Sequence, residues 1–174
     1  MYPLLFELGP VSIYSYGVLL ATAYIVGLQF ALRRADRAGL NGQRVMDLGI
    51  FVIISALVGA KLMLFLLDID RFTSDPAQFM VLLKSGGVFY GGLLLGVPVA
   101  WWYIRRHGLP LWTTCDLFAP GIALGHGIGR MGCLLAGCCY GSPTDVPWAI
   151  TFTSTLAAAN VGTPLEIALH PTQI

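Results

Sequence analysis

The sequence predicts an all-α integral membrane protein with about four transmembrane helices. Hydrophobic residues make up 56% of the 174 positions and charged residues only 11%, whereas soluble domains carry about a quarter charged residues. The mean hydropathy is +0.75. Four stretches approach the roughly 20 apolar residues that a helix needs to cross a bilayer. We therefore expect residues 1–174 to form a single membrane domain.

The predicted spans are about 11–32, 45–67, 88–104 and 115–135. The third is the shortest and contains Pro98, which predicts a kink. Between the second and third spans, Pro76 fits the first turn of a short interfacial helix. The residues after the fourth span, 136–174, predict a small extracytoplasmic segment, and 148–153 is typical of a short strand or an extended surface segment within it.

Loop charges predict the orientation of these spans. The loops after the first and third spans are rich in arginine, namely Arg33, Arg34, Arg37, Arg44, Arg105 and Arg106. In the loop after the second span three aspartates outnumber the two basic residues, and no lysine or arginine follows Arg130. Because positive loops stay in the cytoplasm, we expect the N-terminus and the segment 136–174 outside.

Several classes of protein are disfavoured by the same composition. A net charge of +1 gives no electrostatic basis for binding nucleic acid. No positive segment precedes the first apolar stretch, so a cleaved signal peptide is not expected. The spans hold little acid and show no inverted repeat, which disfavours a channel or transporter.

Arg130 is the most informative residue inside a predicted span. A charge near the bilayer centre costs at least ~2.5–3.5 kcal/mol, so it is normally paired or functional. The planar guanidinium stays charged and matches a phosphate diester, and the lipid headgroup supplies that phosphate. His126 and Cys133 share the helical face of Arg130. This pattern predicts an outward-facing site for a lipid phosphate.

Lys61, Tyr90 and Tyr16 lie toward the outer ends of their predicted spans, and Lys61 and Tyr90 allow two interpretations each. Lys61 either anchors its helix at the interface or binds ligand. Tyr90 follows Gly86-Gly87-Val88-Phe89 and precedes Gly91-Gly92. It either belongs to an interfacial aromatic belt or lies beside a ligand, and Tyr16 allows the belt interpretation as well.

Glycines recur along the fourth span, at Gly121, Gly125, Gly127, Gly129 and Gly132. Small residues four apart let two helices approach closely in lipid, and glycine also gives a ligand access to backbone. We expect packing at the first two positions, whereas packing and ligand access are both open interpretations for the glycines near Arg130.

Three cysteines, Cys133, Cys138 and Cys139, stand at the outer end of the fourth span. They are interpreted as packing residues, as a disulfide pair or as a nucleophile beside Arg130. Adjacent Cys138 and Cys139 chelate poorly and no C-x-x-C pair occurs, so no metal site is expected.

With these residues assembled, the chain resembles the prolipoprotein diacylglyceryl transferase family almost end to end. The shared segments, in order, are Tyr16-Gly17, Gly59-Ala60-Lys61, Gly86-Gly87-Val88-Phe89-Tyr90-Gly91-Gly92, Asp116-Leu117-Phe118-Ala119-Pro120, Gly129-Arg130-x-Gly132-x8-Gly141 and His170-Pro171-Thr172-Gln173. Each is weak alone, but their order and spacing together are specific.

The resemblance implies a multi-pass enzyme of the bacterial inner membrane with an extracytoplasmic active site. It implies transfer of a diacylglyceryl group from phosphatidylglycerol to the lipobox cysteine of a prolipoprotein signal peptide, with no metal or organic cofactor. Arg130 would neutralise the leaving phosphate. The candidate catalytic residues are Arg130, Tyr90, His126, Cys133 and Cys138. The candidate substrate-binding residues are Tyr16, Lys61, Gly91, Gly92, Gly129, Gly132, Tyr140, Gly141 and His170.

The chain departs from the family at four polar positions. Tyr90 stands where the family has a histidine, Cys133 and Ala136 where it has asparagines, and Cys138 where it has a glutamate. Family members also continue beyond the His-Pro motif into further spans with another arginine. Because the glycine frame is retained, we expect a divergent subgroup in which Tyr90 donates a proton or binds phosphate.

Two other hypotheses stay open. One is a transferase acting on another acceptor through a covalent intermediate on Cys133 or Cys138. The other is a non-catalytic lipid-binding or scaffolding membrane protein that keeps only the family frame.

Overall fold

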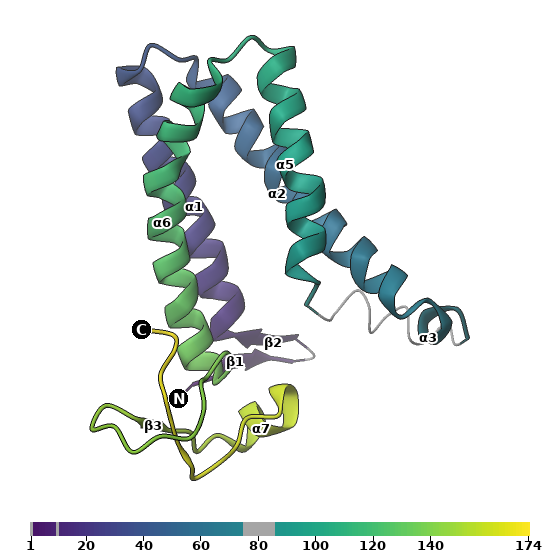
Figure 1. Cartoon of the computed structure of the whole chain (residues 1–174), viewed down its shortest axis with the longest axis vertical. Coiled ribbons are helices and arrows are strands. Elements are labelled where there is room, and N and C mark those ends of the chain that lie inside the picture. The colour runs from purple at the N-terminus through teal and green to yellow at the C-terminus, as the bar shows by residue number, and fades with distance from the viewer. Residues whose placement is uncertain (1, 10, 75–85) are drawn as a thin grey trace. The chain divides into compact units, whose positions relative to one another are not determined.

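The computed structural model describes residues 2–9, 11–74 and 86–174, and it is mostly helical. Its long helices are α1 (Ser15–Arg37), α2 (Gly42–Leu67), α5 (Phe89–Arg106) and α6 (Leu111–Ala136) (Figure 1). Each predicted span overlaps one of these helices. Among the described residues, α1 and α2 are long and apolar enough to cross a membrane. A helical membrane protein is therefore confirmed, whereas the number of four spans stays a prediction.

The chain divides into two compact units. The first unit consists of Met1–Phe30 and Phe118–Ile174, and the second consists of Ala31–Leu117. The first unit holds residues 15–30 of α1 and residues 118–136 of α6 with everything that follows α6, and the second unit holds α2 and α5. A single membrane domain over the whole chain stays a prediction.

In the second unit, α2 and α5 lie side by side at backbone contact. A Cβ atom built on Gly59 would overlap the backbone oxygen of Gly91, and a Cβ on Gly91 would overlap that of Gly59. At the other end of the pair, Arg44 Nη1 donates to the His107 carbonyl over 3.0 Å. Asn41 caps α2, since its side chain accepts from the N–H groups of Gln43 and Arg44. Pro98 lies inside α5, and its kink stays a prediction.

In the first unit, α1 and α6 meet through glycine. A Cβ on Gly121 would lie 2.6 Å from the Gly27 carbonyl oxygen, and a Cβ on Gly27 would lie 2.8 Å from the Gly121 oxygen. A Cβ on Gly125 would come within 3.2 Å of the Ala23 oxygen. Both contacts are with backbone, which cannot rotate away. The predicted packing role of Gly121 and Gly125 is therefore confirmed.

The predicted start of the first span at residue 11 is wrong. Residues Leu4–Leu8 form β1 and Val11–Tyr14 form β2, an antiparallel hairpin. The β-branched Ile13 and the aromatic Tyr14 favour a strand, and Gly9 takes the left-handed φ of +60° in the connection. Helix α1 begins at Ser15, whose N–H and hydroxyl both donate to the Pro3 carbonyl, at 3.0 and 3.3 Å.

After α2, the described chain continues into the short helix α3 (Ile69–Ser74). The predicted interfacial helix beginning at Pro76 lies outside the described residues.

The segment after α6 folds on a small core of its own. Strands β3 (Ile150–Thr151) and β4 (Ala168–Leu169) pair antiparallel, which confirms the predicted strand near residue 150. Helix α7 (Thr155–Val161) lies between them, capped by Ser154 at its start and by Gly162 in left-handed conformation at its end. Phe152, Leu169 and Ala157 are fully buried beneath these elements.

Candidate functional site

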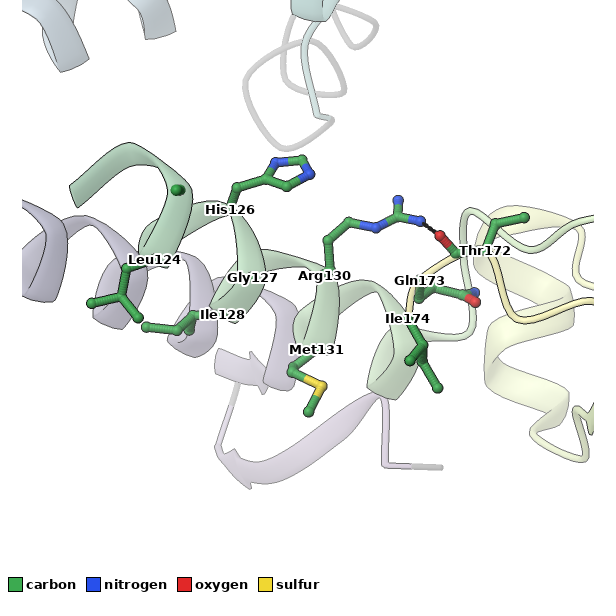
Figure 2. Close-up of a pocket in the computed structure, with 10 residues that line it drawn as sticks. Leu124, His126, Gly127, Ile128, Arg130, Met131, Thr172, Gln173 and Ile174 are labelled. Atoms are coloured by element: carbon green, nitrogen blue, oxygen red, sulfur yellow. Dashed lines mark hydrogen bonds between the residues drawn. The ribbon is translucent and has the colours of Figure 1, made fainter. Parts of the chain in front are cut away.

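Arg130 borders an open hollow formed by the last half of α6 and residues 172–174. Figure 2 shows His126 and Arg130 pointing to the same side of α6, while Leu124, Ile128 and Met131 point to the other. The shared face follows from the spacing of four residues between His126 and Arg130. The Arg130 guanidinium donates through Nη2 to the Thr172 carbonyl (Figure 2).

The loop after α6 docks onto the His170-Pro171-Thr172-Gln173 segment. Gly141 N–H donates to the His170 carbonyl over 2.9 Å, and His170 N–H donates to the Ser142 carbonyl over 3.0 Å. A Cβ on Gly141 would lie 3.0 Å from the His170 oxygen and 2.9 Å from Thr172 Cγ2. The glycine at this position therefore permits the close approach that brings the two distant family segments together.

The side chains of Thr172 and Gln173 donate hydrogen bonds to the backbone carbonyls of two cysteines. Gln173 Nε2 donates to the Cys138 carbonyl over 2.7 Å, and Thr172 Oγ1 donates to the Cys139 carbonyl. Gln173 is only 4% exposed. Residues 172–173 therefore provide the hydrogen-bond donors for the carbonyls of Cys138 and Cys139. The same residues include the carbonyl that accepts a hydrogen bond from Arg130.

A turn at the end of α6 gathers the three thiols. Cys138 N–H donates to the Cys133 carbonyl over 3.0 Å and Gly137 N–H to the Leu134 carbonyl over 3.3 Å, the double hydrogen bond of a Schellman motif. Gly137 takes the left-handed φ of 76° that this motif requires. As a result, the Sγ atoms of Cys133, Cys138 and Cys139 lie within 4.8 Å of one another.

The surroundings of Cys138 disfavour a nucleophilic role for its thiol. Burial, with smaller effects from the neighbouring Cys133 and Cys139 thiols, raises the pKa of Cys138 to about 12. Because the thiolate is the reactive form, this raised pKa disfavours Cys138 as a nucleophile.

The substrate-binding candidates of the first unit have different surroundings. A Cβ on Gly132 would lie 3.3 Å from Tyr16 Cδ2, so these two residues pack α6 against α1. Gly129 has nothing within 4 Å of an added Cβ and faces open space. Tyr140 donates to the Gly162 carbonyl over 3.1 Å, and its ring lies 5.8 Å from that of Phe152. Of these candidates, Gly129 has the surroundings that ligand access requires.

The remaining candidates belong to the second unit. Tyr90 is 67% exposed at the start of α5, with its ring edge against Phe89. Gly91 and Gly92 pack against α2, which gives both a structural reason to be glycine. Lys61 Nζ donates to the Gly86 carbonyl over 3.1 Å and so ties α2 to the chain before α5. Their participation in a site with Arg130 stays a prediction.

Sequence reasoning did not assign Thr172, Gln173 and Cys139 to the site. The first two stood in a recognised family segment, but no residue spacing indicated that they hold the cysteine backbone. The turn at Gly137 brings the Cys133 thiol to those of Cys138 and Cys139, and residue spacing does not indicate this turn.

Nearly the whole chain is similar to proteins named as diacylglyceryl transferases. Residues 3–174 match the family model described as "Prolipoprotein diacylglyceryl transferase". The phosphatidylglycerol--prolipoprotein diacylglyceryl transferase of Clostridium tetani is 35% identical over 174 residues, which are 100% of this chain and 68% of that protein. Proteins of the same name from Synechococcus elongatus and Vibrio vulnificus are 32% and 31% identical, over 85% and 99% of this chain.

The chain spans 51% of the Synechococcus protein and 61% of the Vibrio protein. The predicted resemblance is confirmed, because the family model matches residues 3–174, a range that includes Arg130 and the glycines around it. This chain belongs to the prolipoprotein diacylglyceryl transferase family.

Proposed function

We propose that this chain transfers a diacylglyceryl group from phosphatidylglycerol to the cysteine sulfur of a prolipoprotein lipobox. The names of the relatives support the reaction and both substrates. The observation that carries the proposal is the position of Arg130, which lies at the edge of an open hollow with its guanidinium anchored on the Thr172 carbonyl.

The chemistry requires a cation at the leaving group. The acceptor sulfur attacks the glycerol carbon that bears the phosphate, the carbon–sulfur bond forms, and the carbon–oxygen bond breaks to release glycerol phosphate. A guanidinium has five N–H donors, of which one is used on Thr172. The others are available for a bidentate bond to phosphate, where they offset the charge that develops as the phosphate leaves.

We propose that the reaction takes place at the extracytoplasmic face of the bacterial inner membrane. Four spans with the arginine-rich loops in the cytoplasm would place the outer end of α6 and residues 136–174 on the extracytoplasmic side of the bacterial inner membrane. Phosphatidylglycerol in that leaflet would then reach Arg130 at headgroup depth.

The reaction is tested with the purified full chain in liposomes that contain phosphatidylglycerol and a lipobox peptide. We expect mass spectrometry to detect a diacylglyceryl group on the peptide cysteine. A peptide with serine in place of that cysteine and liposomes of phosphatidylcholine alone serve as controls, and neither should give the product. Binding of phosphatidylglycerol without any mass gain on the cysteine peptide would contradict the proposal.

That last outcome would favour the second candidate function, a non-catalytic lipid-binding protein. The observation on its side is the replacement of the family's polar residues by Tyr90, Cys133, Ala136 and Cys138. A third candidate, covalent transfer through a cysteine of this chain, is weakened at Cys138 by its raised pKa and at Cys133 by burial of its side chain.

Tyr90 is proposed as proton donor or phosphate ligand in this reaction. Replacing Tyr90 with phenylalanine is expected to lower turnover by about 10²-fold, since general acid–base groups contribute roughly 10²–10⁴-fold. Turnover of the cysteine peptide is the measurement, and Tyr14→Phe, a second exposed tyrosine, is the matched control. Unchanged turnover in Tyr90→Phe would remove the proposed role.

A further inference from the structure

We propose that Cys133, Cys138 and Cys139 form a binding site for one zinc(II) ion. Their three Sγ atoms lie within 4.8 Å of one another, although they come from the last turn of α6 and from the loop that follows it. Thiolates are the ligands that select zinc over magnesium or calcium in proteins.

The sulfur positions agree with the size of a zinc site. A tetrahedral ion with Zn–S bonds of about 2.3 Å separates its sulfur ligands by about 3.8 Å. The Sγ atoms of the adjacent Cys138 and Cys139 are 3.8 Å apart. The other separations are at most 4.8 Å, so they need to close by about 1 Å or less, which small side-chain rotations supply.

The backbone that presents the thiols is held without a metal. The turn at Gly137 bonds Cys138 to Cys133 through the main chain. Gln173 and Thr172 then donate to the carbonyls of Cys138 and Cys139. Hydrogen bonds outside the ligand shell fix ligands in natural metal sites in the same way. The cluster is therefore ordered before an ion arrives.

The local charge also favours a divalent ion. Three thiolates around zinc(II) carry a net charge of −1. Arg130 lies three residues before Cys133 on α6, which is the neighbouring position on the helical face. The positive charge of the Arg130 guanidinium offsets the net negative charge of the zinc–thiolate cluster. This matters because burying a charge without a partner of opposite sign is costly.

Three protein ligands leave the fourth position of a tetrahedral ion open, as in catalytic rather than structural zinc sites. Cys139 is exposed, so the cluster can be reached from solvent. A thiol that binds zinc loses its proton, in this case to water. We infer that the thiol of the lipobox cysteine occupies this fourth position, an inference that rests on the proposed function. Binding to zinc would then deprotonate that thiol in place of the base that the family's polar residues would supply.

The site is tested on the purified, reduced full chain in detergent, loaded with zinc(II) or cobalt(II) and freed of excess metal. We expect one zinc per chain by elemental mass spectrometry and a sulfur-to-cobalt charge-transfer absorption. Cys133→Ser and Cys139→Ser should each weaken metal binding by about tenfold or more, because each removes one of three ligands. Cys115→Ser, an exposed cysteine in the first turns of α6, is the matched control and should keep both signals.

Two results would overturn the metal site: a wild-type chain that retains no metal, or a disulfide among these cysteines under reducing conditions. Cys139→Ser changes an exposed side chain, so it tests the site even if Cys133→Ser disturbs folding. A lipobox peptide should change the cobalt spectrum and its serine version should not; an unchanged spectrum would refute thiol binding. None of these measurements needs turnover, so a failure of the proposed reaction is distinguished from a failure of the site.

Discussion

Replacing Arg130 by alanine is expected to lower diacylglyceryl transfer by about 10²–10³-fold, the loss typical when one preorganised donor to a developing negative charge is removed. The substitution removes the cation beside the hollow and also the hydrogen bond to the Thr172 carbonyl. The measurement is the initial rate of peptide modification in phosphatidylglycerol liposomes.

Two further variants separate charge from geometry and from folding. Arg130→Lys keeps the positive charge but not the planar fork, so its rate should lie between those of the native chain and the alanine variant. Arg106→Ala, at the end of α5, removes an exposed arginine and should retain the native rate. A rate for Arg130→Ala within about threefold of native, with thermal unfolding unchanged, would exclude Arg130 from the electrostatic role.

Replacing Gly121 by leucine is expected to lower the free energy of unfolding by about 3 kcal/mol, the upper part of the usual range for overpacking. A Cβ on Gly121 would lie 2.6 Å from the carbonyl oxygen and 3.3 Å from the carbonyl carbon of Gly27. Backbone cannot yield by changing a rotamer, so α1 and α6 must separate. The free energy is measured in detergent micelles by titration with a denaturing detergent, followed by circular dichroism.

Gly127→Leu is the matched control on the same helix. An added Cβ there meets nothing within 4 Å, so the same side chain should cost little or stabilise α6 through its better helix propensity. Equal loss in the two variants would mean that the glycine contact between α1 and α6 does not hold the helices together.

Hydrophobic length predicted the helices well, because continuous apolar residues determine where a membrane helix can run. The same criterion failed at residues 11–14, where apolar residues pair as β2 in a hairpin. Apolar length does not distinguish a strand from a helix over four residues. The turn at Gly9 and the β-branched residue Ile13 favour a hairpin, and the length of the apolar stretch does not report on either.

The site was predictable in part. Arg130 and His126 could be placed together because they stand four apart on one helix. The contact between Arg130 and Thr172 joins residues 42 positions apart. The repeat of a helix or a strand predicts only contacts between residues that are close in the sequence, so it could not predict this one. The gathering of Cys133 with Cys138 depends on a left-handed residue at Gly137, and the sequence showed a glycine there without showing which turn it makes.

The glycines of α6 have a thermodynamic consequence for the site. Five of the twelve residues from 121 to 132 are glycine, and each disfavours a helix by about 0.5–1 kcal/mol relative to alanine. This stretch therefore gains much of its order from α1, through Gly27, Ala23 and Tyr16. Formation of the helix pair and alignment of Arg130 are thus coupled. An anionic lipid that binds only the aligned arginine must then stabilise the helix pair by mass action, so the chain should resist unfolding best in membranes rich in phosphatidylglycerol.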